Sequence, residues 1–216
     1  IDDTINTKVV LRILSSIAFL HSERMIYKDL KPENILFNHD FEPFLTDLGA
    51  ISNEENVTSH FGNPLFAAPE FLNDKEYKNK VDVYSFGLLL FYICTDNEDF
   101  ITKNQIVKQQ LIPTRCHIYQ NIYTQSTKED QRNRPNSIDL LFEIIYNELF
   151  FPNTNKDEIY LLVNQIVTDI NFKDQEIYKP FFIMKGIAYQ EDFELALELI
   201  EESELQILEN ELLCNE

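Results

Sequence analysis

Four polar residues that could do chemistry together are grouped in the stretch YKDLKPENILFNHDFEPFLTDLG, namely Asp29, Lys31, Asn34 and Asp47. Carboxylate and amide oxygens suit Mg2+, which is usually held by one or two protein groups plus substrate phosphates. Lys31, two residues from Asp29, would balance negative charge close to a carboxylate. A site of this kind fits phosphoryl transfer, in which the protein mainly positions groups and stabilises charge.

Short strands are predicted to position these four residues. Residues 25–27, 35–37 and 44–45 are short apolar pieces, and a turn-like NHD precedes the last of them, so we expect a hairpin between the last two. Pro32 prevents a helix through the middle of the charged loop. Residues 47–67 have no clean period and contain glycine and proline, which predicts a long ordered or switchable loop.

Helices are predicted over most of the remaining chain. Apolar residues recur at three- and four-residue intervals in residues 4–23, which favours an amphipathic helix. Residues 81–94 are apolar nearly all round, which indicates a helix buried in the centre of the domain. The further predicted helices are residues 101–112, 116–125, 137–150, 157–170, 174–188 and 191–213.

The composition limits the partners of the chain. A formal net charge of -19 would repel a nucleic-acid backbone or an anionic membrane, so we predict neither as a partner. The longest apolar run, residues 86–94, is about half of the roughly 20 residues that a membrane span needs. The cysteines are few and widely spaced, and the histidines lack the spacing of a metal site or a catalytic triad. We therefore expect a reduced, cytoplasmic location and structural or surface histidines.

Five motifs, in order along the chain, resemble those of eukaryotic protein kinases. YKDLKPENILF resembles the catalytic loop, TDLG the metal-binding Asp-Phe-Gly, and AAPE the end of the activation segment. DVYSFGLLL resembles the central helix that follows, and RNRPNS the Arg-Pro near the end of the domain. The resemblance covers about residues 5–150 and is to serine/threonine kinases, with the tyrosine-kinase-like group as a candidate subgroup.

The resemblance implies an α+β fold, the mainly α-helical C-terminal lobe of a kinase domain with a small β-hairpin cluster. We expect this lobe at residues 1–150 and an acidic α-helical extension at residues 151–216, where 15 acidic residues stand against 4 lysines. Residues 186–203 faintly resemble one repeat of the Sel1 and tetratricopeptide kind. A generic helical extension is favoured, because such repeats need about three neighbours. The extension is a candidate surface for protein partners.

The resemblance also implies roles in catalysis. Asp29 would accept or orient the proton of the attacking substrate hydroxyl. Lys31 would neutralise the transferring phosphate of ATP. Asn34 and Asp47 would hold Mg2+ against the phosphates, and Leu36 would lie beneath the adenine ring.

Four further residues would have structural roles on the same resemblance. Glu70 and Arg134 would form the buried ion pair that ties the activation segment to the lobe. Asp82 would hold the backbone of the catalytic loop. Gly49 would supply the backbone freedom that the metal-binding loop needs when it changes state.

The chain departs from the family pattern in and after the catalytic loop. Tyr27 replaces the usual His and can fill the same apolar stack. Lys28 replaces an Arg that grips a phosphorylated activation loop with a planar, two-pronged donor, which Lys lacks. Control by phosphorylation therefore stays open, with Thr58 and Ser59 as candidate sites.

Two other departures lie in the activation segment. Leu48 replaces the usual Phe, an apolar change that keeps its packing role. Asn63 stands where serine/threonine kinases generally carry a Thr that bonds the catalytic Asp and Lys. Because Asn also forms hydrogen bonds, this change weakens the inference of activity without excluding it.

The ATP-binding half of a kinase is not visible in the sequence. A Gly-rich loop and a strand Lys belong to the N-terminal lobe, and neither is found before the catalytic loop. We expect a piece of a longer protein, completed by that missing lobe and inactive alone. Two functions stay open: a kinase that transfers the γ-phosphoryl group of ATP to Ser/Thr hydroxyls of protein substrates, and a pseudokinase scaffold that presents its helical tail to protein partners.

Overall fold

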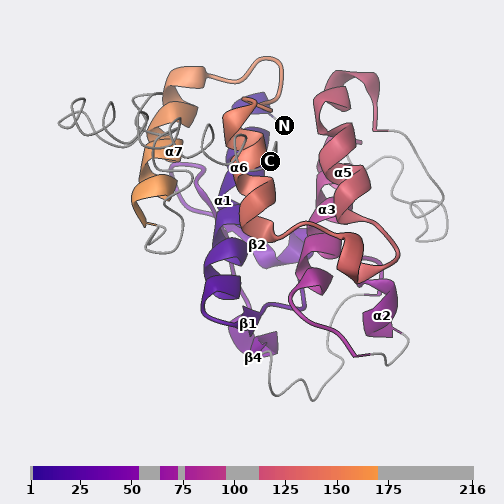
Figure 1. Ribbon diagram of the computed structural model, residues 1–216. Helices are drawn as coiled ribbons and strands as arrows, with labels where there is room; N and C mark the ends of the chain where they lie inside the picture. Colours follow the sequence, from indigo (N-terminus) through magenta and orange to yellow (C-terminus); the bar gives the residue numbers. More distant parts are fainter. Residues whose placement is uncertain (1, 54–63, 73–75, 96–111, 170–216) are drawn as a thin grey trace, which may run out of the picture. The chain divides into compact units, whose positions relative to one another are not determined.

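The computed structural model describes residues 2–53, 64–72, 76–95 and 112–169 (Figure 1). The chain forms two compact units, residues 1–159 and 160–216. All of the elements described below lie in the first unit, except for the later part of the last helix. In the described ranges, no helix combines the length and the apolar character that crossing a bilayer requires.

The first helix, α1 (Asp3–Ser22), confirms the helix predicted over residues 4–23. It begins after Asp2, whose carboxylate accepts hydrogen bonds from the backbone N–H groups of Thr4 at 2.6 Å and Ile5 at 3.3 Å. This cap satisfies donors that the first turn of a helix leaves without partners. The apolar face of α1 is fully buried and includes Ile13 and Ile17.

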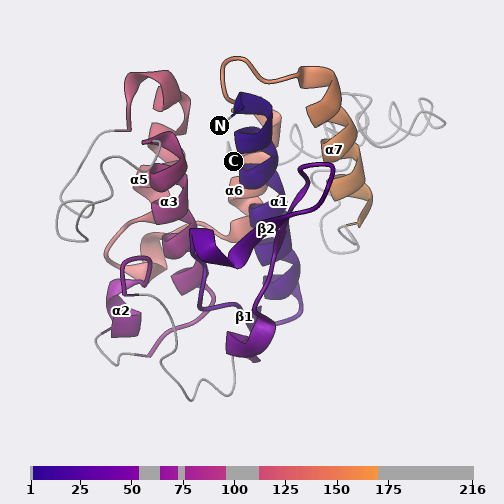
Figure 2. The same cartoon turned by 180° about the vertical axis from the view of Figure 1, so that it is seen from behind.

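The second long helix, α3 (Lys80–Cys94), confirms the helix predicted at the centre of the domain. Eleven of its residues from Val81 to Phe91 are buried in succession, polar ones included. It lies beside α5 (Gln120–Ser126) (Figure 2). The two helices approach closely at Gly87, where a Cβ atom would lie 2.8 Å from the Ser126 Cβ and 2.8 Å from the Thr127 Cγ2.

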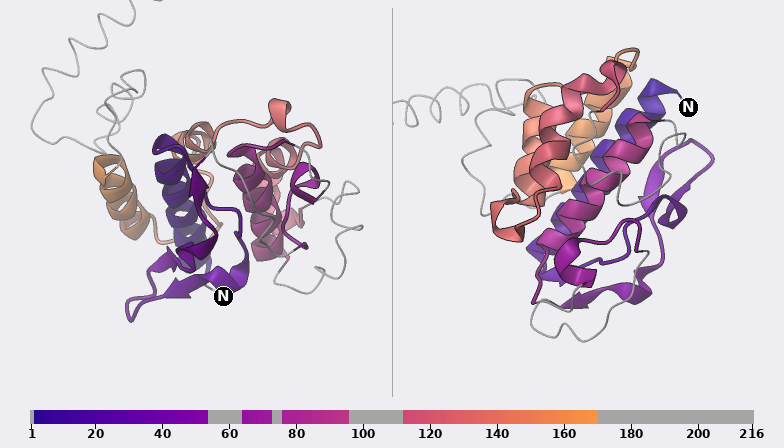
Figure 3. Two further views of the ribbon diagram at one scale, coloured as in Figure 1. Left: turned by 90° about the horizontal axis from the view of Figure 1, so that it is seen from below. Right: turned by 90° about the vertical axis from the view of Figure 1, so that its right-hand side faces the viewer.

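Four short strands form two antiparallel pairs on one side of α1 and α3. Strand β1 (Met25–Ile26) pairs with β4 (Ser52–Asn53), and β2 (Ile35–Phe37) pairs with β3 (Pro43–Leu45). The second pair is the predicted hairpin. Figure 3 shows that the strands lie on one side of α1 and α3, whereas α5 and α6 lie on the other side.

The helix α6 (Ser137–Tyr146) lies beside α1 and is shorter than the predicted residues 137–150. It ends because Glu148 adopts a left-handed conformation with φ of 49°. The N–H of Glu148 then donates to the carbonyl of Ile145 at 3.2 Å, and the N–H of Leu149 to that of Ile144 at 2.9 Å. These two bonds form a Schellman motif, in which glycine is the usual left-handed residue.

Other elements differ in detail from the predictions. Pro32 excludes an α-helix but begins a 3-10 turn, Pro32–Asn34, because the first position of a helical turn needs no N–H donor. The helix predicted at residues 116–125 is split into a 3-10 helix, Thr114–Tyr119, and α5. The remaining elements are the 3-10 turns Leu48–Ala50 and Gln131–Asn133, α2 (Pro69–Leu72) and α7 (Lys156–Asp169).

Some of the predictions fall on residues that are not described. These are the helices at residues 174–188 and 191–213, the repeat-like stretch at 186–203, and all but the last residue of the helix at 101–112. The candidate phosphorylation sites Thr58 and Ser59, and the departure at Asn63, also lie outside the described residues.

Candidate functional site

Three of the four chemically active candidates form one buried cluster. The Nζ of Lys31 lies 2.6 Å from Oδ2 of Asp29. The Nδ2 of Asn34 donates both to the backbone carbonyl of Asp29 at 2.8 Å and to its Oδ2 at 3.0 Å. Asp29 and Asn34 are both buried, so these polar contacts are shielded from water.

The 3-10 turn Pro32–Asn34 brings Asn34 back to Asp29. Lys31 is extended before the turn, and the N–H of Asn34 donates to the carbonyl of Lys31 at 3.1 Å. The fixed φ of Pro32 suits the first position of such a turn. The turn thereby brings Asn34 into direct contact with Asp29, five residues earlier in the sequence.

The β2–β3 hairpin brings Asp47 to the same place. Its strands pair Ile35 with Leu45, and beyond this pair the N–H of Thr46 donates to the carbonyl of Asn34 at 2.9 Å. Asp47 is the next residue, so Asn34 and Asp47 flank the open end of the hairpin. The Asp47 side chain is exposed, and no described group binds its carboxylate.

The left-handed residue of the TDLG segment is Asp47, with φ of 51°, and not Gly49. Our expectation that Gly49 supplies backbone freedom when the loop changes state stays a prediction. A Cβ atom at Gly49 would lie 3.3 Å from Oδ1 of Asp47, which is tight but not prohibitive. Asp is among the residues that tolerate a left-handed backbone best.

Asn34 and Asp47 fit Mg2+ by the chemistry of the atoms that they offer. Because the nitrogen of the Asn34 amide binds Asp29, its oxygen is the atom that remains for a cation. The exposed Asp47 carboxylate adds a second hard oxygen donor. Among the described residues there is no cluster of three or more His, Cys, Asp or Glu side chains, so two protein ligands plus phosphates describe the candidate site better than an all-protein cage.

Tyr27 connects the segment that carries Asp29 with the strand end that carries Asp47. Its side chain is fully buried, and its hydroxyl donates to the backbone carbonyl of Thr46. Burial raises the pKa of Tyr27, and the charges of Asp29 and Asp47 add to this effect, so the phenol stays protonated as a donor. Tyr27 thus holds the residue before Asp47.

The carboxylate of Asp82, in the first turn of α3, holds the backbone of the catalytic loop. Its Oδ2 accepts the N–H of Tyr27 and its Oδ1 that of Lys28, both at 2.8 Å. Lys28 has a left-handed backbone with φ of 71°, so this anchor stabilises an unfavourable conformation. The Lys28 side chain is buried, and this burial lowers its pKa.

A chain of contacts through His21 was not predicted from the sequence. Nε2 of His21 lies 2.9 Å from Oδ2 of Asp82, and Nδ1 lies 2.8 Å from Oγ of Ser137, the first residue of α6. Ser137 and Asp82 are 2% and 1% exposed, which leaves no access for a substrate. The arrangement is therefore a structural link from α6 to the catalytic loop, and no sequence spacing predicted it.

Glu70 of α2 and Arg134 form a buried, bidentate ion pair. Two guanidinium nitrogens lie 2.5 Å and 2.9 Å from the two Glu70 oxygens. Arg134 also donates to the carbonyls of Lys80, Lys128 and Glu129, and its guanidinium lies 4.8 Å from the centre of the Tyr84 ring. Every part of this cation is thus compensated in a buried position, and α2 is tied to the body of the unit.

The two apolar candidates are exposed. Leu36 on β2 is 50% exposed, and its cross-strand partner Phe44 is 44% exposed. Leu36 is therefore accessible to a planar ligand, as its expected place beneath an adenine ring requires. Leu48 is 62% exposed among the described residues, and its packing role stays a prediction.

The sequence is similar to those of known proteins. A family model described as "Protein kinase domain" matches residues 1–177. The human "Receptor-interacting serine/threonine-protein kinase 1" is 36% identical over 128 residues, which are 50% of this chain and 19% of that protein. The "RGS domain-containing serine/threonine-protein kinase A" of Dictyostelium discoideum is 32% identical over 150 residues, 63% of this chain and 13% of that protein.

A third relative is the human "Dual serine/threonine and tyrosine protein kinase", which is 38% identical over 89 residues, 41% of this chain and 10% of that protein. The chain thus spans between 10% and 19% of the length of these three relatives.

Proposed function

Because the chain belongs to the protein kinase family, we propose that it forms the catalytic-loop half of an active site that transfers the γ-phosphoryl group of ATP to a hydroxyl of a protein substrate. One observation carries this proposal. Lys31 and Asn34 each contact Asp29 directly, and the open end of one hairpin places Asp47 next to Asn34.

Each residue of the cluster has a chemical role in the proposed reaction. Asp29 orients the substrate hydroxyl and receives its proton as the oxygen attacks the γ-phosphorus. Lys31, which is 2.6 Å from Asp29, is near enough to neutralise charge on the transferring group. Asn34 and Asp47 would hold Mg2+, which supplies positive charge against the phosphates.

We propose serine and threonine as the acceptor residues. Lys31 in the sequence DLKPEN supports this choice, because that motif resembles serine/threonine kinases more than tyrosine kinases. The names of two relatives also contain the term serine/threonine-protein kinase. A dual-specificity relative, however, makes tyrosine phosphorylation an outcome that the assay must include.

The proposed activity belongs to the natural protein that combines this chain with an ATP-binding lobe. The 216 residues contain no Gly-x-Gly with which a Gly-rich loop would cover the phosphates. On this proposal the lobe extends to about residue 150, and the acidic residues 151–216 form an extension that is available to protein partners. The isolated chain should therefore turn over little ATP.

A pseudokinase scaffold is the second candidate, and specific residues favour it. Lys28 replaces the Arg of the family pattern, and Asn63 replaces a Thr. The first change would affect the response to phosphorylation of the activation segment, and the second removes a Thr that bonds the catalytic Asp and Lys in serine/threonine kinases. The scaffold proposal predicts that the natural protein binds partners through its tail without magnesium-dependent ATP turnover.

The deciding experiment measures phosphorylation of a generic protein substrate by the natural protein and by its Asp29→Asn variant. We expect the variant to lose all measurable transfer while it stays folded. Asp40→Asn is the matched control, because its side chain lies on the exposed hairpin turn. Undiminished activity of Asp29→Asn would exclude the proposed mechanism, and an inactive wild-type protein would favour the scaffold.

A further inference from the structure

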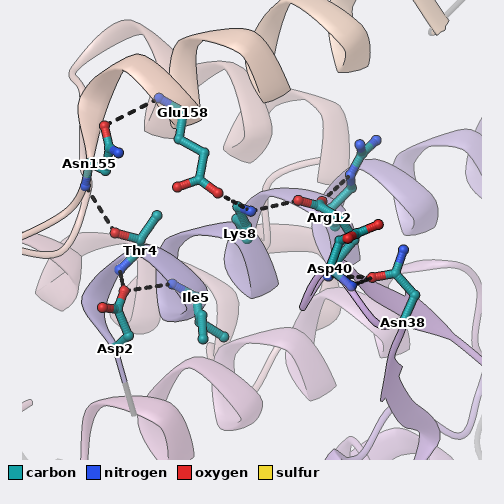
Figure 4. A network of polar contacts seen from close by, with 10 residues as sticks. Asp2, Thr4, Ile5, Lys8, Arg12, Asn38, Asp40, Asn155 and Glu158 are labelled. Carbon is teal, nitrogen blue, oxygen red and sulfur yellow. Dashed lines mark hydrogen bonds and ion pairs between the residues drawn. The ribbon is translucent and has the colours of Figure 1, made fainter.

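The ammonium group of Lys8 lies where three segments of the first unit meet (Figure 4). Lys8 is on α1 and is only 5% exposed. Its Nζ lies 2.6 Å from Oε1 of Glu42, at the end of the hairpin turn, and 2.5 Å from Oε1 of Glu158, in the first turn of α7. One buried cation therefore joins α1, the hairpin and the start of α7.

The charges around Lys8 are balanced. Arg12 lies one turn further along α1, and its Nε is 3.7 Å from Oε2 of Glu42, so two cations face two carboxylates. Burial opposes the charge of Lys8, but the hydrogen bonds to Glu158 and Glu42 outweigh it and raise the pKa of the lysine. Lys8 is therefore charged throughout the physiological range.

The turn of the hairpin is built so that it presents Glu42 in a fixed position. Oδ1 of Asn38 accepts the N–H groups of Asp40 and Glu42, both at 2.9 Å. The N–H of Phe41 donates to the carbonyl of Asn38 at 3.1 Å, and Phe41 is left-handed with φ of 58°. A turn with these constraints moves as one body, so a bond to Glu42 restrains the hairpin as a whole.

The residues before α7 hold Glu158 against α1 from the other side. Oγ1 of Thr154 lies 2.7 Å from Oγ1 of Thr7, and the N–H of Asn155 donates to Oγ1 of Thr4 at 2.9 Å. Glu158 lies three residues after Asn155, in the first turn of α7. The second carboxylate of the Lys8 cluster is therefore anchored independently of the hairpin.

The hairpin has three residues in each strand, and an isolated two-stranded hairpin is marginally stable in water. The outward side chains Leu36, Phe37 and Phe44 contribute little to the stability of the hairpin, because all three are exposed. Contacts with neighbouring segments must then determine its position. Tyr27 and Asp29 bind its open end, and Lys8 of α1 binds its turn. Asn34 and Asp47 flank its open end, so any tilt of the turn moves both.

We propose that Lys8 is a positioning residue for the candidate magnesium ligands, because it holds Glu42 and thereby fixes the hairpin that carries Asn34 and Asp47. This inference rests on the proposed function for its chemical meaning. Glu158 keeps the ammonium group in place, so the start of α7 contributes to the geometry of a site to which it adds no ligand. Lys8 itself touches neither substrate nor metal.

Amide hydrogen exchange of the full 216-residue chain tests the positioning directly, since exchange reports local opening without any need for activity. In Lys8→Met we expect the hairpin amides, with the N–H of Thr46 as the reporter, to exchange about tenfold faster or more. The amides of α3 should change far less. Glu42→Gln should act in the same direction. The double variant should resemble Lys8→Met alone, because both changes remove the Lys8–Glu42 ion pair.

Lys156→Met is the matched control, because Lys156 forms an exposed ion pair with Glu148 near the same end of α7. It should leave exchange in the hairpin unchanged. Unaltered hairpin exchange in a folded Lys8→Met chain would overturn the inference, and so would an equal acceleration in the hairpin and α3, which indicates only a general loss of stability. If Lys8→Met does not fold, the milder Glu42→Gln decides by the same criteria.

An activity measurement on the natural protein separates this inference from the proposed function. Lys8→Met should raise the Mg2+ concentration for half-maximal transfer several-fold, while the rate at saturating Mg2+ changes little. An unchanged Mg2+ requirement would refute the link to the metal ligands. If the wild-type protein transfers no phosphate, the proposed function fails, and hydrogen exchange alone decides whether Lys8 positions the hairpin.

Discussion

His21 of α1 and Asp82 of α3 are joined by a hydrogen bond of 2.9 Å between Nε2 and Oδ2. The same carboxylate accepts two backbone N–H groups of the catalytic loop. Asp82 therefore connects two central helices and the loop that carries Asp29. Burial of this carboxylate costs free energy, and the three hydrogen bonds that it accepts offset the cost.

Asp82→Asn should destabilise the chain by on the order of 3–5 kcal/mol, the cost of breaking a buried charged network. An amide has only one acceptor atom, so one loop N–H would face the new NH2 group. Urea denaturation of the isolated chain measures the change. Asp40→Asn serves as the exposed control, and a variant as stable as the wild type would mean that the loop does not depend on this carboxylate.

Arg134→Met should also cost on the order of 3–5 kcal/mol, because it leaves Glu70 buried without a partner and removes the donors to three carbonyls. Arg132, two residues earlier, is a matched control: its side chain is 86% exposed and binds Asp130 at the surface. Arg132→Met should leave the denaturation midpoint almost unchanged. If both substitutions lowered the free energy of unfolding equally, burial of the ion pair would not be the cause of the effect.

Gly87→Ala should destabilise the packing of α3 against α5. The new methyl group would lie 2.8 Å from side-chain atoms of Ser126 and Thr127, and overpacking of this kind costs about 1–3 kcal/mol. The higher helix propensity of alanine would offset about 1 kcal/mol of that cost. Thermal unfolding followed by circular dichroism measures the net change. Gly49→Ala, at an exposed turn, is the comparison and should have the smaller effect.

Asp47→Asn should separate function from stability. The side chain is exposed and bound by no described group, and Asn tolerates the left-handed backbone at this position, so the melting temperature should stay the same. Loss of one charge-stabilising group should lower phosphoryl transfer by the natural protein about a hundredfold or more. Retained activity would remove Asp47 from the proposed metal site.

The elements that carry the site were predictable because their signals are local. Apolar periodicity predicted α1, continuous apolar character predicted α3, and the turn NHD between short apolar runs predicted the β2–β3 hairpin. The α+β description with small antiparallel pairs follows from these elements. Asp29, Lys31 and Asn34 were predicted as a group because they are close in sequence.

The contacts that were not predicted join residues far apart in sequence. His21 and Ser137 are separated by 116 positions, and Lys8 and Glu42 by 34. Neither pair has a spacing that periodicity can detect. The left-handed backbone of Asp47 and Glu148 was also missed, because a left-handed residue is expected at glycine or asparagine, and tertiary contacts stabilise it at these two.

Asn34 is a neutral residue at a place where a carboxylate would bind Mg2+ more strongly. Its amide has two unlike ends, a nitrogen for Asp29 and an oxygen for a cation. An aspartate here would set a second anion beside Asp29 and would offer no N–H to it. In the proposed site, the amide would therefore serve a cation and Asp29 at the same time.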